Sequence, residues 1–171
     1  LLAHFKDERG GFYFTANDHE ALIHKPKPLA DEAVPSGNGM AAIALVRLGH
    51  LAGEQRYLDA AEGTIRAALH AIERYPEGHA TLLQALEETL LPPQIVVVRA
   101  PRAALAPWQS ALHTDYAPHR SSFVIPDEAK LTGLLAERAP RAGGVAYVCS
   151  GMTCRTPLGA PTELRTALAE G

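Results

Sequence analysis

The chain has 171 residues, of which 47% are apolar and 20% charged, and its formal net charge is −3. This is a globular composition with enough apolar residues for a buried core, and it carries no basic excess of the kind that neutralises a phosphate backbone. No apolar run approaches the roughly 20 residues that span a bilayer, and the first residues lack a signal-peptide pattern. We therefore expect a soluble, cytoplasmic protein with no nucleic-acid or membrane partner.

The histidines and cysteines do not point to a metal or a cofactor. Eight histidines are scattered without HExxH or another close ligand spacing, so we predict no metal site. Two cysteines, Cys149 and Cys154, exclude a disulfide-dense secreted scaffold. The turn at residues 99–103 lacks GxGxxG, which disfavours dinucleotide binding, and we predict no cofactor.

The N-terminal residues contain two β-prone runs. Residues 1–5 look like the last turn of a helix whose beginning is missing, so we expect the chain to be a fragment. The aromatic run 10–15 is followed by turn residues, and 21–24 can return as a partner strand. We predict a β-hairpin across residues 11–24.

A rigid polar loop then leads into an apolar helix. Three prolines between Lys25 and Asn38 keep this approach extended, and Ser36 or Asn38 can accept hydrogen bonds from the first free amides of the helix. A helix N-terminus carries partial positive charge and suits an anionic or hydroxyl-rich ligand. The loop is therefore a candidate ligand site.

The apolar spacing predicts three helices before residue 93. The first, 38–52, is apolar nearly all round, and the second, 57–74, is amphipathic and should pack antiparallel on the first because the connection is short. A third helix runs from Pro76 to about Leu90. Two prolines then stop the helical region, so we place a domain boundary between residues 92 and 93.

The second part of the chain alternates apolar runs with helical patterns. Runs at 95–98, 122–125 and 145–148 are short and continuous, as in parallel strands that are covered on both faces. Helices are predicted around 105–112, 129–138 and 161–169. This order predicts a small three-stranded parallel α/β unit in three layers over residues 93–171.

Several segments resemble one protein family. The C-terminal region of the spermatogenesis-associated, thioredoxin-domain-containing protein family is similar to residues 10–15, 25–27, 31, 35–38, 57–61 and 147–157. The resemblance implies a longer protein with a thioredoxin-like domain, an (α/α)6 barrel similar to N-acylglucosamine 2-epimerases, and a short α/β tail. Residues 1–92 would then be the last barrel helices with the β-hairpin, in an α-rich α+β fold. No CxxC occurs here, so a redox activity of the absent domain cannot be assigned to these residues.

The same resemblance places the hairpin and the polar loop at the barrel mouth. The polar groups that would converge on a sugar-like ligand are Lys25, Lys27, Asp31, Ser36 and Asn38, with Phe12, Tyr13 and Phe14 as stacking surfaces. In the alternative interpretation the loop caps a helix, Asp31 pairs with a lysine, and the aromatic side chains fill the core. No acid–base pair is identified, although Glu20, His24, Asp31 and Glu32 qualify by residue type.

The two cysteines follow the third predicted strand, where open α/β sheets place ligands. Four intervening residues are too many for a redox CxxC, and two cysteines are half of a structural zinc site. We interpret Cys149 and Cys154 as free thiols, with a local disulfide or a metal site shared with another segment as alternatives.

These patterns leave three functions open. The first is a carbohydrate-like ligand site in the barrel of the longer protein; the second is a non-enzymatic interaction module; the third is thiol redox work through Cys149 and Cys154. The apolar faces of helices 38–52 and 58–72 would be uncovered in an incomplete barrel. We therefore predict that the chain dimerises or packs on the rest of its parent chain.

Overall fold

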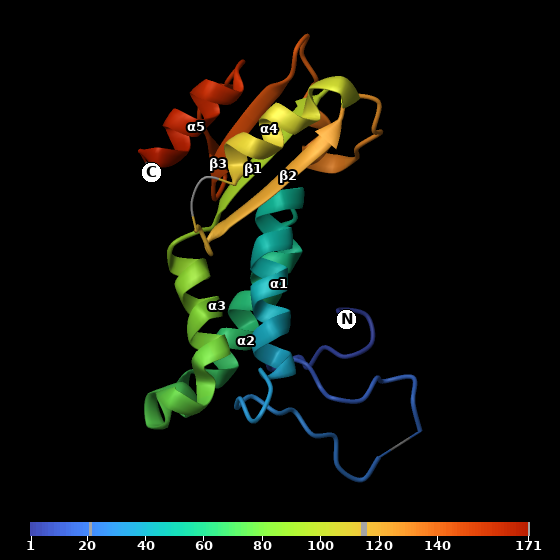
Figure 1. The fold of residues 1–171 in the computed structure, drawn as a ribbon. Coiled ribbons are helices and arrows are strands. Elements are labelled where there is room, and N and C mark those ends of the chain that lie inside the picture. Colours follow the sequence, from blue (N-terminus) through green and yellow to red (C-terminus); the bar gives the residue numbers. More distant parts are fainter. Residues whose placement is uncertain (21, 114–115, 171) are drawn as a thin grey trace. The chain divides into compact units, whose positions relative to one another are not determined.

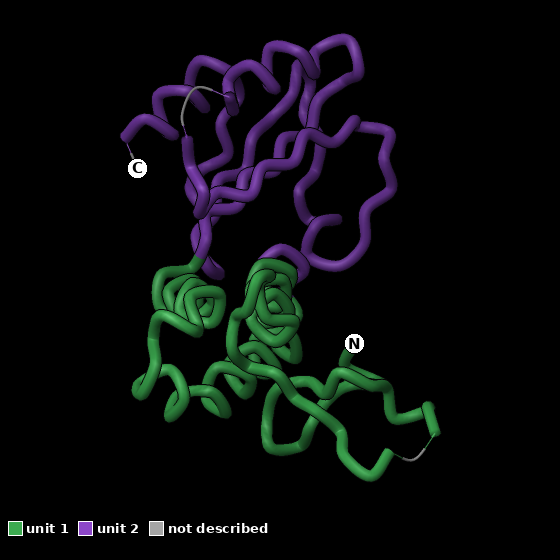
Figure 2. The backbone as a smooth tube through the Cα atoms, turned by 60° about the horizontal axis from the view of Figure 1, so that its bottom comes forward, with its two compact units in different colours: residues 1–49, 54–92 green, residues 50–53, 93–171 purple. Residues whose placement is uncertain are grey.

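The computed structural model describes residues 1–20, 22–113 and 116–170. The chain divides into two compact units, shown in Figure 2. Unit 1 consists of residues 1–49 and 54–92, and unit 2 consists of residues 50–53 and 93–171. The fold is mixed, with helices and a four-stranded sheet.

Unit 1 contains the three predicted helical regions. They are α1 (Gly37–Ala52), α2 (Gln55–Arg74), and the 3-10 turn η1 (Pro76–His79) that leads into α3 (Ala80–Leu90) (Figure 1). Val46 of α1 packs with Ala60 and Ala61 of α2, while Ile43, nearer the start of α1, packs with Ile65, further along α2. The two helices are therefore antiparallel, as predicted. A third apolar cluster, Ala68, Ile72 and Leu82, joins α2 to α3.

The predicted β-hairpin at residues 11–24 is not formed in the described part of this segment, and Ala21 lies outside the described residues. The aromatic run instead returns to the segment before it: Lys6 and Phe12 form an isolated antiparallel bridge, and the Tyr13 amide donates to the Phe5 carbonyl at 2.8 Å. Gly10, with φ +93°, reverses the chain at a place where a Cβ would lie 2.1 Å from the Gly63 carbonyl oxygen. Because the reversal lies before the aromatic run, residues 5–6 become its partner.

Unit 2 is built on a mixed sheet. Its strands are β1 (Gln94–Ala100), β2 (Arg120–Pro126), β3 (Val145–Ser150) and β4 (Thr153–Cys154), in the order β2-β1-β3-β4. β1 and β2 are parallel, but β3 is antiparallel to β1, so the prediction of a three-stranded parallel sheet was wrong. Ala100 pairs with Pro126, and Arg99 pairs with Val145. The chain therefore leaves β2 and enters β3 at the same end of β1, and no crossover is needed.

The helix predicted at 129–138 is replaced by the short 3-10 helix η3 (Gly133–Glu137). Gly133 has φ +58°, which a continuous α-helix does not permit. Arg99 Nη2 donates to the carbonyls of Asp127 at 2.8 Å and Ala129 at 3.1 Å, so these carbonyls are bound outside any helix. A buried arginine on β1 thus holds the segment after β2 in a non-helical path.

The other two predicted helices of unit 2 are present and cover one face of the sheet. They are α4 (Leu105–Leu112), which follows the 3-10 turn η2 (Arg102–Ala104), and α5 (Pro161–Ala169) (Figure 1). Trp108 and Leu164 pack with Val96 and Val98 in the largest core cluster. The opposite face carries Ile95, Val97, Val145 and Tyr147, with Leu135 of η3 against them. On this second face the short 3-10 helix η3 takes the place of the α-helix that the three-layer prediction expected there.

Among the residues that the structure describes, no helix combines the length and the apolar character that a membrane crossing requires.

Candidate functional site

Asn38 is the most extensively bonded of the predicted ligand residues. It lies in the first turn of α1, and 3% of it is exposed. Its Oδ1 accepts from the Phe12 amide at 2.7 Å, and its Nδ2 donates to the carbonyls of Phe12 at 3.0 Å and Pro28 at 2.8 Å. Asn38 therefore joins the aromatic run, the proline-rich approach and the start of α1.

Ser36 and Asp31 close the same loop. Ser36 Oγ accepts from the Gly39 amide at 3.0 Å, which is an N-cap bond, as the capping interpretation predicted. Asp31 accepts from the amides of Ser36 at 2.7 Å and Thr81 at 2.8 Å. Burial raises the pKa of Asp31, but these amide bonds outweigh burial and leave that pKa below its ordinary value. The expected lysine partner of Asp31 was wrong, because backbone amides of two helix starts take its place.

The two lysines have different environments. Lys27 Nζ donates to Asp7 Oδ2 at 2.7 Å and to the Gly10 carbonyl at 2.8 Å. The hydrogen bond from Lys27, together with that from the Arg9 amide, lowers the pKa of Asp7 to about 2. Lys25 is half-buried and has no hydrogen-bonding partner within the described part of the chain. Asp7 is a partner that the sequence analysis missed.

The three aromatic residues differ in how far they are exposed. Phe12 is buried in the α1–α2 core with Leu45 and Ala61, so for this residue the core interpretation is confirmed. Tyr13 is half-buried, and Lys27 Nζ lies 6.0 Å from its ring centroid. Phe14 is exposed. Two of the three rings are thus available at the surface of unit 1.

A cavity of about 420 Å³ lies between the aromatic run and the loop that precedes α1. Its walls include Phe12, Tyr13, Phe14, Glu32, Ser36 and Asn38. Lys25, Lys27 and Asp31 do not line it, so the structure brings together five of the eight predicted ligand residues. Glu32 is the one carboxylate among the described lining residues, and the described walls therefore hold no pair of carboxylates or histidines for acid–base catalysis.

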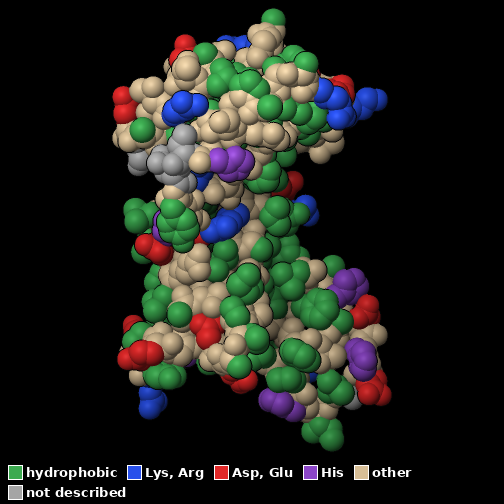
Figure 3. Space-filling view, viewed as in Figure 1, with side chains coloured by type: hydrophobic (Ala, Val, Ile, Leu, Met, Phe, Trp, Pro, Cys, Tyr) green, Lys and Arg blue, Asp and Glu red, His purple; other side chains and the backbone are tan. Residues whose placement is uncertain are grey.

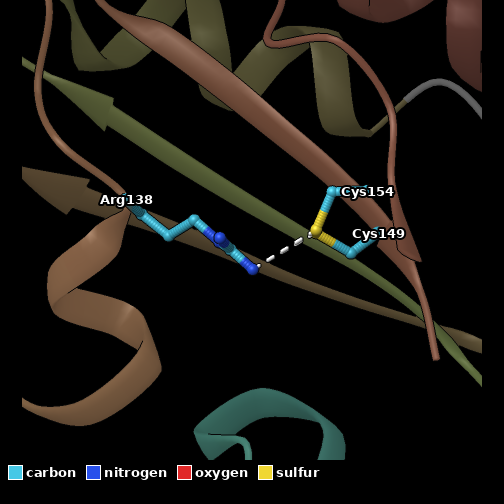
Figure 4. Close-up of a disulfide and its surroundings, with 3 residues drawn as sticks. All are labelled: Arg138, Cys149 and Cys154. Carbon is cyan, nitrogen blue, oxygen red and sulfur yellow. Dashed lines mark hydrogen bonds between the residues drawn. A yellow bond between two sulfur atoms is a disulfide. The ribbon is translucent and has the colours of Figure 1, made fainter. Parts of the chain in front are cut away.

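Cys149 and Cys154 form a disulfide, so the leading interpretation as free thiols was wrong and the local-disulfide alternative is confirmed. The two residues face each other across the β3–β4 pair. Figure 4 shows Arg138 reaching the sulfurs: its Nη2 lies 3.3 Å from Cys154 Sγ and 3.6 Å from Cys149 Sγ. Arg138 precedes Cys149 by 11 positions in an unrelated segment, and no motif in the sequence identifies it as a partner.

Within the described ranges, no group of three or more His, Cys, Asp and Glu side chains is placed to hold a metal ion.

Comparison with known proteins gives one consistent relationship. No protein-family model matches the chain. Spermatogenesis-associated protein 20 from Homo sapiens is 27% identical over 180 residues, which cover 96% of this chain and 22% of the human protein. The protein of the same name from Mus musculus is 28% identical over 182 residues, with the same two coverages. The chain is therefore homologous to spermatogenesis-associated protein 20 over almost its whole length, and it spans about a fifth of the length of these relatives.

Proposed function

We propose that this chain is a non-enzymatic structural and interaction module of a longer protein. In this proposal, unit 1 docks on further helices of that protein through one face of α1. The observation that carries the proposal is an apolar face formed by Met40, Ala44 and Leu48, with Leu1 beside it; we name these four residues the α1 apolar face. Met40 is 50% exposed and Leu48 is 47% exposed.

The spacing of this face fits another helix. Met40, Ala44 and Leu48 are four residues apart and therefore form one ridge along α1, which is the feature that packs into the groove of a neighbouring helix. A cavity of about 390 Å³ beside the ridge is lined by Leu1, Leu2, Ala41 and Tyr57. In Figure 3, hydrophobic side chains gather over α1 and the N-terminal segment. Arg56, which is paired with Glu54 at 3.1 Å, supplies a polar rim.

The occupant that we propose is the remainder of the longer protein, because the homologous proteins are more than four times as long as the matched region. By the family resemblance, α1 to α3 would be the last helices of an (α/α)6 barrel and the occupant would be its preceding helices. The polar side chains at the start of α1 support a structural role, since Asp31, Ser36 and Asn38 form their hydrogen bonds with main-chain groups of unit 1.

The oligomeric state of the chain tests the docking proposal. Without its occupant the α1 apolar face is open, so we expect concentration-dependent self-association in sedimentation velocity. The double substitution Met40→Gln with Leu48→Gln should give a monomer, because it replaces the two largest exposed side chains of the ridge. Leu69→Gln, at an exposed leucine of α2, is the matched control and should leave self-association unchanged. A wild-type chain that stays monomeric up to its solubility limit would contradict the proposal.

Binding of a carbohydrate-like ligand is the second candidate, and the cavity of about 420 Å³ favours it. This volume lies within the range of small-molecule sites, and Tyr13 and Phe14 offer faces on which a sugar ring can stack. Calorimetry with a panel of neutral and N-acetylated sugars tests it. Phe14→Ala should weaken binding, because Phe14 is exposed and lines the cavity, whereas Lys25→Ala should not, because Lys25 lies outside it. Absence of heat with every sugar would remove this candidate.

We also propose a cytoplasmic location, on the composition of the chain. Stable disulfides are rare in that compartment, where thiol reductants keep cysteines reduced. In the cytoplasm the Cys149–Cys154 bridge would therefore exchange with those reductants.

A further inference from the structure

We propose that Cys149 and Cys154 form a thiol–disulfide exchange site for a dithiol reductant, in which Arg138 stabilises the thiolate that leaves. This site lies in unit 2 and does not depend on the docking role proposed for unit 1. Its elements are one exposed cysteine, one buried cysteine and a guanidinium at both sulfurs.

The position of the bridge makes one cysteine accessible and the other protected. Cys154 is exposed on β4, whereas Cys149 is 6% exposed on β3. The Arg155 amide donates to the Val148 carbonyl at 2.9 Å, so the neighbouring pair Cys149–Cys154 occupies a non-hydrogen-bonded position. Side chains at such positions approach most closely, and backbone bonds on either side hold the strands together without the bridge.

The bridge closes a loop of five positions, for which the entropic stabilisation by a disulfide is small. Reduction therefore does not have to unfold the sheet.

Arg138 is held in place for this role. Its guanidinium carbon lies 5.6 Å from the Tyr147 ring centroid, and the Tyr147 hydroxyl donates to the Ala139 carbonyl at 2.7 Å. Tyr147 and Cys149 are two residues apart on β3 and share one face of the sheet, so the guanidinium can contact the ring and the sulfurs together. In the described part of the chain Arg138 has no carboxylate within ion-pair distance.

The surroundings admit a reductant. A cavity of about 270 Å³ is lined by Leu135, Arg138, Cys149, Met152 and Cys154. Glu137 and His50 are the other titratable residues along this cavity, and burial lowers the pKa of His50, which favours its neutral form at neutral pH. Arg138 is therefore the cation nearest to the sulfurs.

The exchange balances in two steps. A thiolate of the dithiol attacks Cys154 Sγ, a mixed disulfide forms, the Cys149–Cys154 bond breaks, and Cys149 leaves as a thiolate beside Arg138. The second thiolate of the reductant then attacks the reductant's sulfur atom in the mixed disulfide, and Cys154 is released as a thiolate. The reductant loses two electrons and becomes a disulfide, the protein gains them, and the two thiol protons of the reductant pass through solvent to the two cysteines. A nearby cation lowers the pKa of a thiol, and a leaving thiol of lower pKa leaves faster.

The test is the equilibrium between the chain and dithiothreitol at neutral pH. The ratio of reduced to oxidised reagent is varied, free thiols are trapped with an alkylating reagent, and the reduced fraction is read by mass. Arg138→Met removes the charge and keeps most of the side-chain volume, and we expect it to lower the reduction equilibrium constant about tenfold, the size of one charge-assisted hydrogen bond. Arg138→Lys should recover part of that loss. Arg141→Met, at an exposed arginine of the same segment, is the matched control and should behave as wild type.

Circular dichroism of each variant in both redox states shows whether the sheet is retained. Equal equilibrium constants for wild type, Arg138→Met and Arg141→Met would overturn the role of Arg138. A bridge that dithiothreitol reduces only after the chain is unfolded by urea, or a chain that keeps both thiols free under oxidising conditions, would overturn the exchange site itself.

Discussion

At the scale of single residues, Asn38 shows why a plausible ligand residue can be structural. Its residue type and its place at a helix start suit both a ligand contact and a cap. The structure places its amide between the two main-chain groups of Phe12 and the carbonyl of Pro28. Those partners lie 26 and 10 positions away, so no local pattern identifies them. The amide of Asn38 therefore fixes the loop against α1.

Asp7 gives a prediction for acid stability. Its pKa is lowered from 3.8 to about 2 in the folded chain, so its bond to Lys27 stabilises the fold above about pH 4 and is lost as pH falls towards 2. We expect Asp7→Asn to lower the free energy of unfolding by about 1–2 kcal/mol at neutral pH. Urea unfolding at a series of pH values measures this effect, and the difference from wild type should disappear near pH 2. Glu8→Gln, at the exposed neighbour, is the control; a difference for Asp7→Asn that does not change with pH would contradict the assignment.

At the scale of elements, a charge pair with a buried carboxylate joins α1 to α3 in unit 1, in addition to the apolar contacts. Arg47 of α1 donates to both carboxylate oxygens of Glu88 on α3, with Nε at 2.8 Å from Oε2. Glu88 is fully buried, and its hydrogen bond raises the pKa of Arg47. Apolar spacing predicts the helices, but it does not predict this pair, because the two residues are 41 positions apart.

This pair gives a prediction for stability. Glu88→Gln should lower the free energy of unfolding by about 2–3 kcal/mol, because it removes the charge of a fully buried carboxylate that is hydrogen-bonded to the Arg47 guanidinium. The double substitution Arg47→Met with Glu88→Leu should recover much of that loss, since it replaces both members of the pair with apolar side chains. Glu62→Gln breaks the exposed Arg66–Glu62 pair of α2 and should cost less than about 0.5 kcal/mol. Equal effects of Glu88→Gln and Glu62→Gln in urea unfolding would refute a stabilising role of the Arg47–Glu88 pair.

The strands of unit 2 show the limit of element prediction. The runs at 95–98, 122–125 and 145–148 are strands, as predicted, because continuous apolar segments of this length fill a sheet that is packed on both faces. The apolar runs do not predict the relative directions of these strands. The antiparallel direction of β3 depends on how residues 127–144 return to the same end of β1, and that path is held by Arg99 and by the positive φ of Gly133.

At the scale of the whole molecule, the chain covers about a fifth of the length of its relatives. The proposed docking of unit 1 and the proposed exchange site of unit 2 rest on different residues and on different physical effects, burial of apolar area in one and stabilisation of a thiolate in the other. Loss of self-association in the α1 variant and a lower reduction equilibrium constant in Arg138→Met are therefore independent results.

The sequence by itself determined the class and order of most elements. It also indicated the helix start at Ser36, the pairing chemistry open to Cys149 and Cys154, and the relationship to spermatogenesis-associated protein 20. These properties follow from spacing and residue type along the chain. The tertiary structure decided the partners: Phe12 with residue 6, Lys27 with Asp7, β3 antiparallel to β1, and Arg138 at the disulfide. These contacts join residues that are far apart in the sequence or that lie in irregular segments. They are selected by packing and by the path of the chain, and a local sequence pattern contains neither.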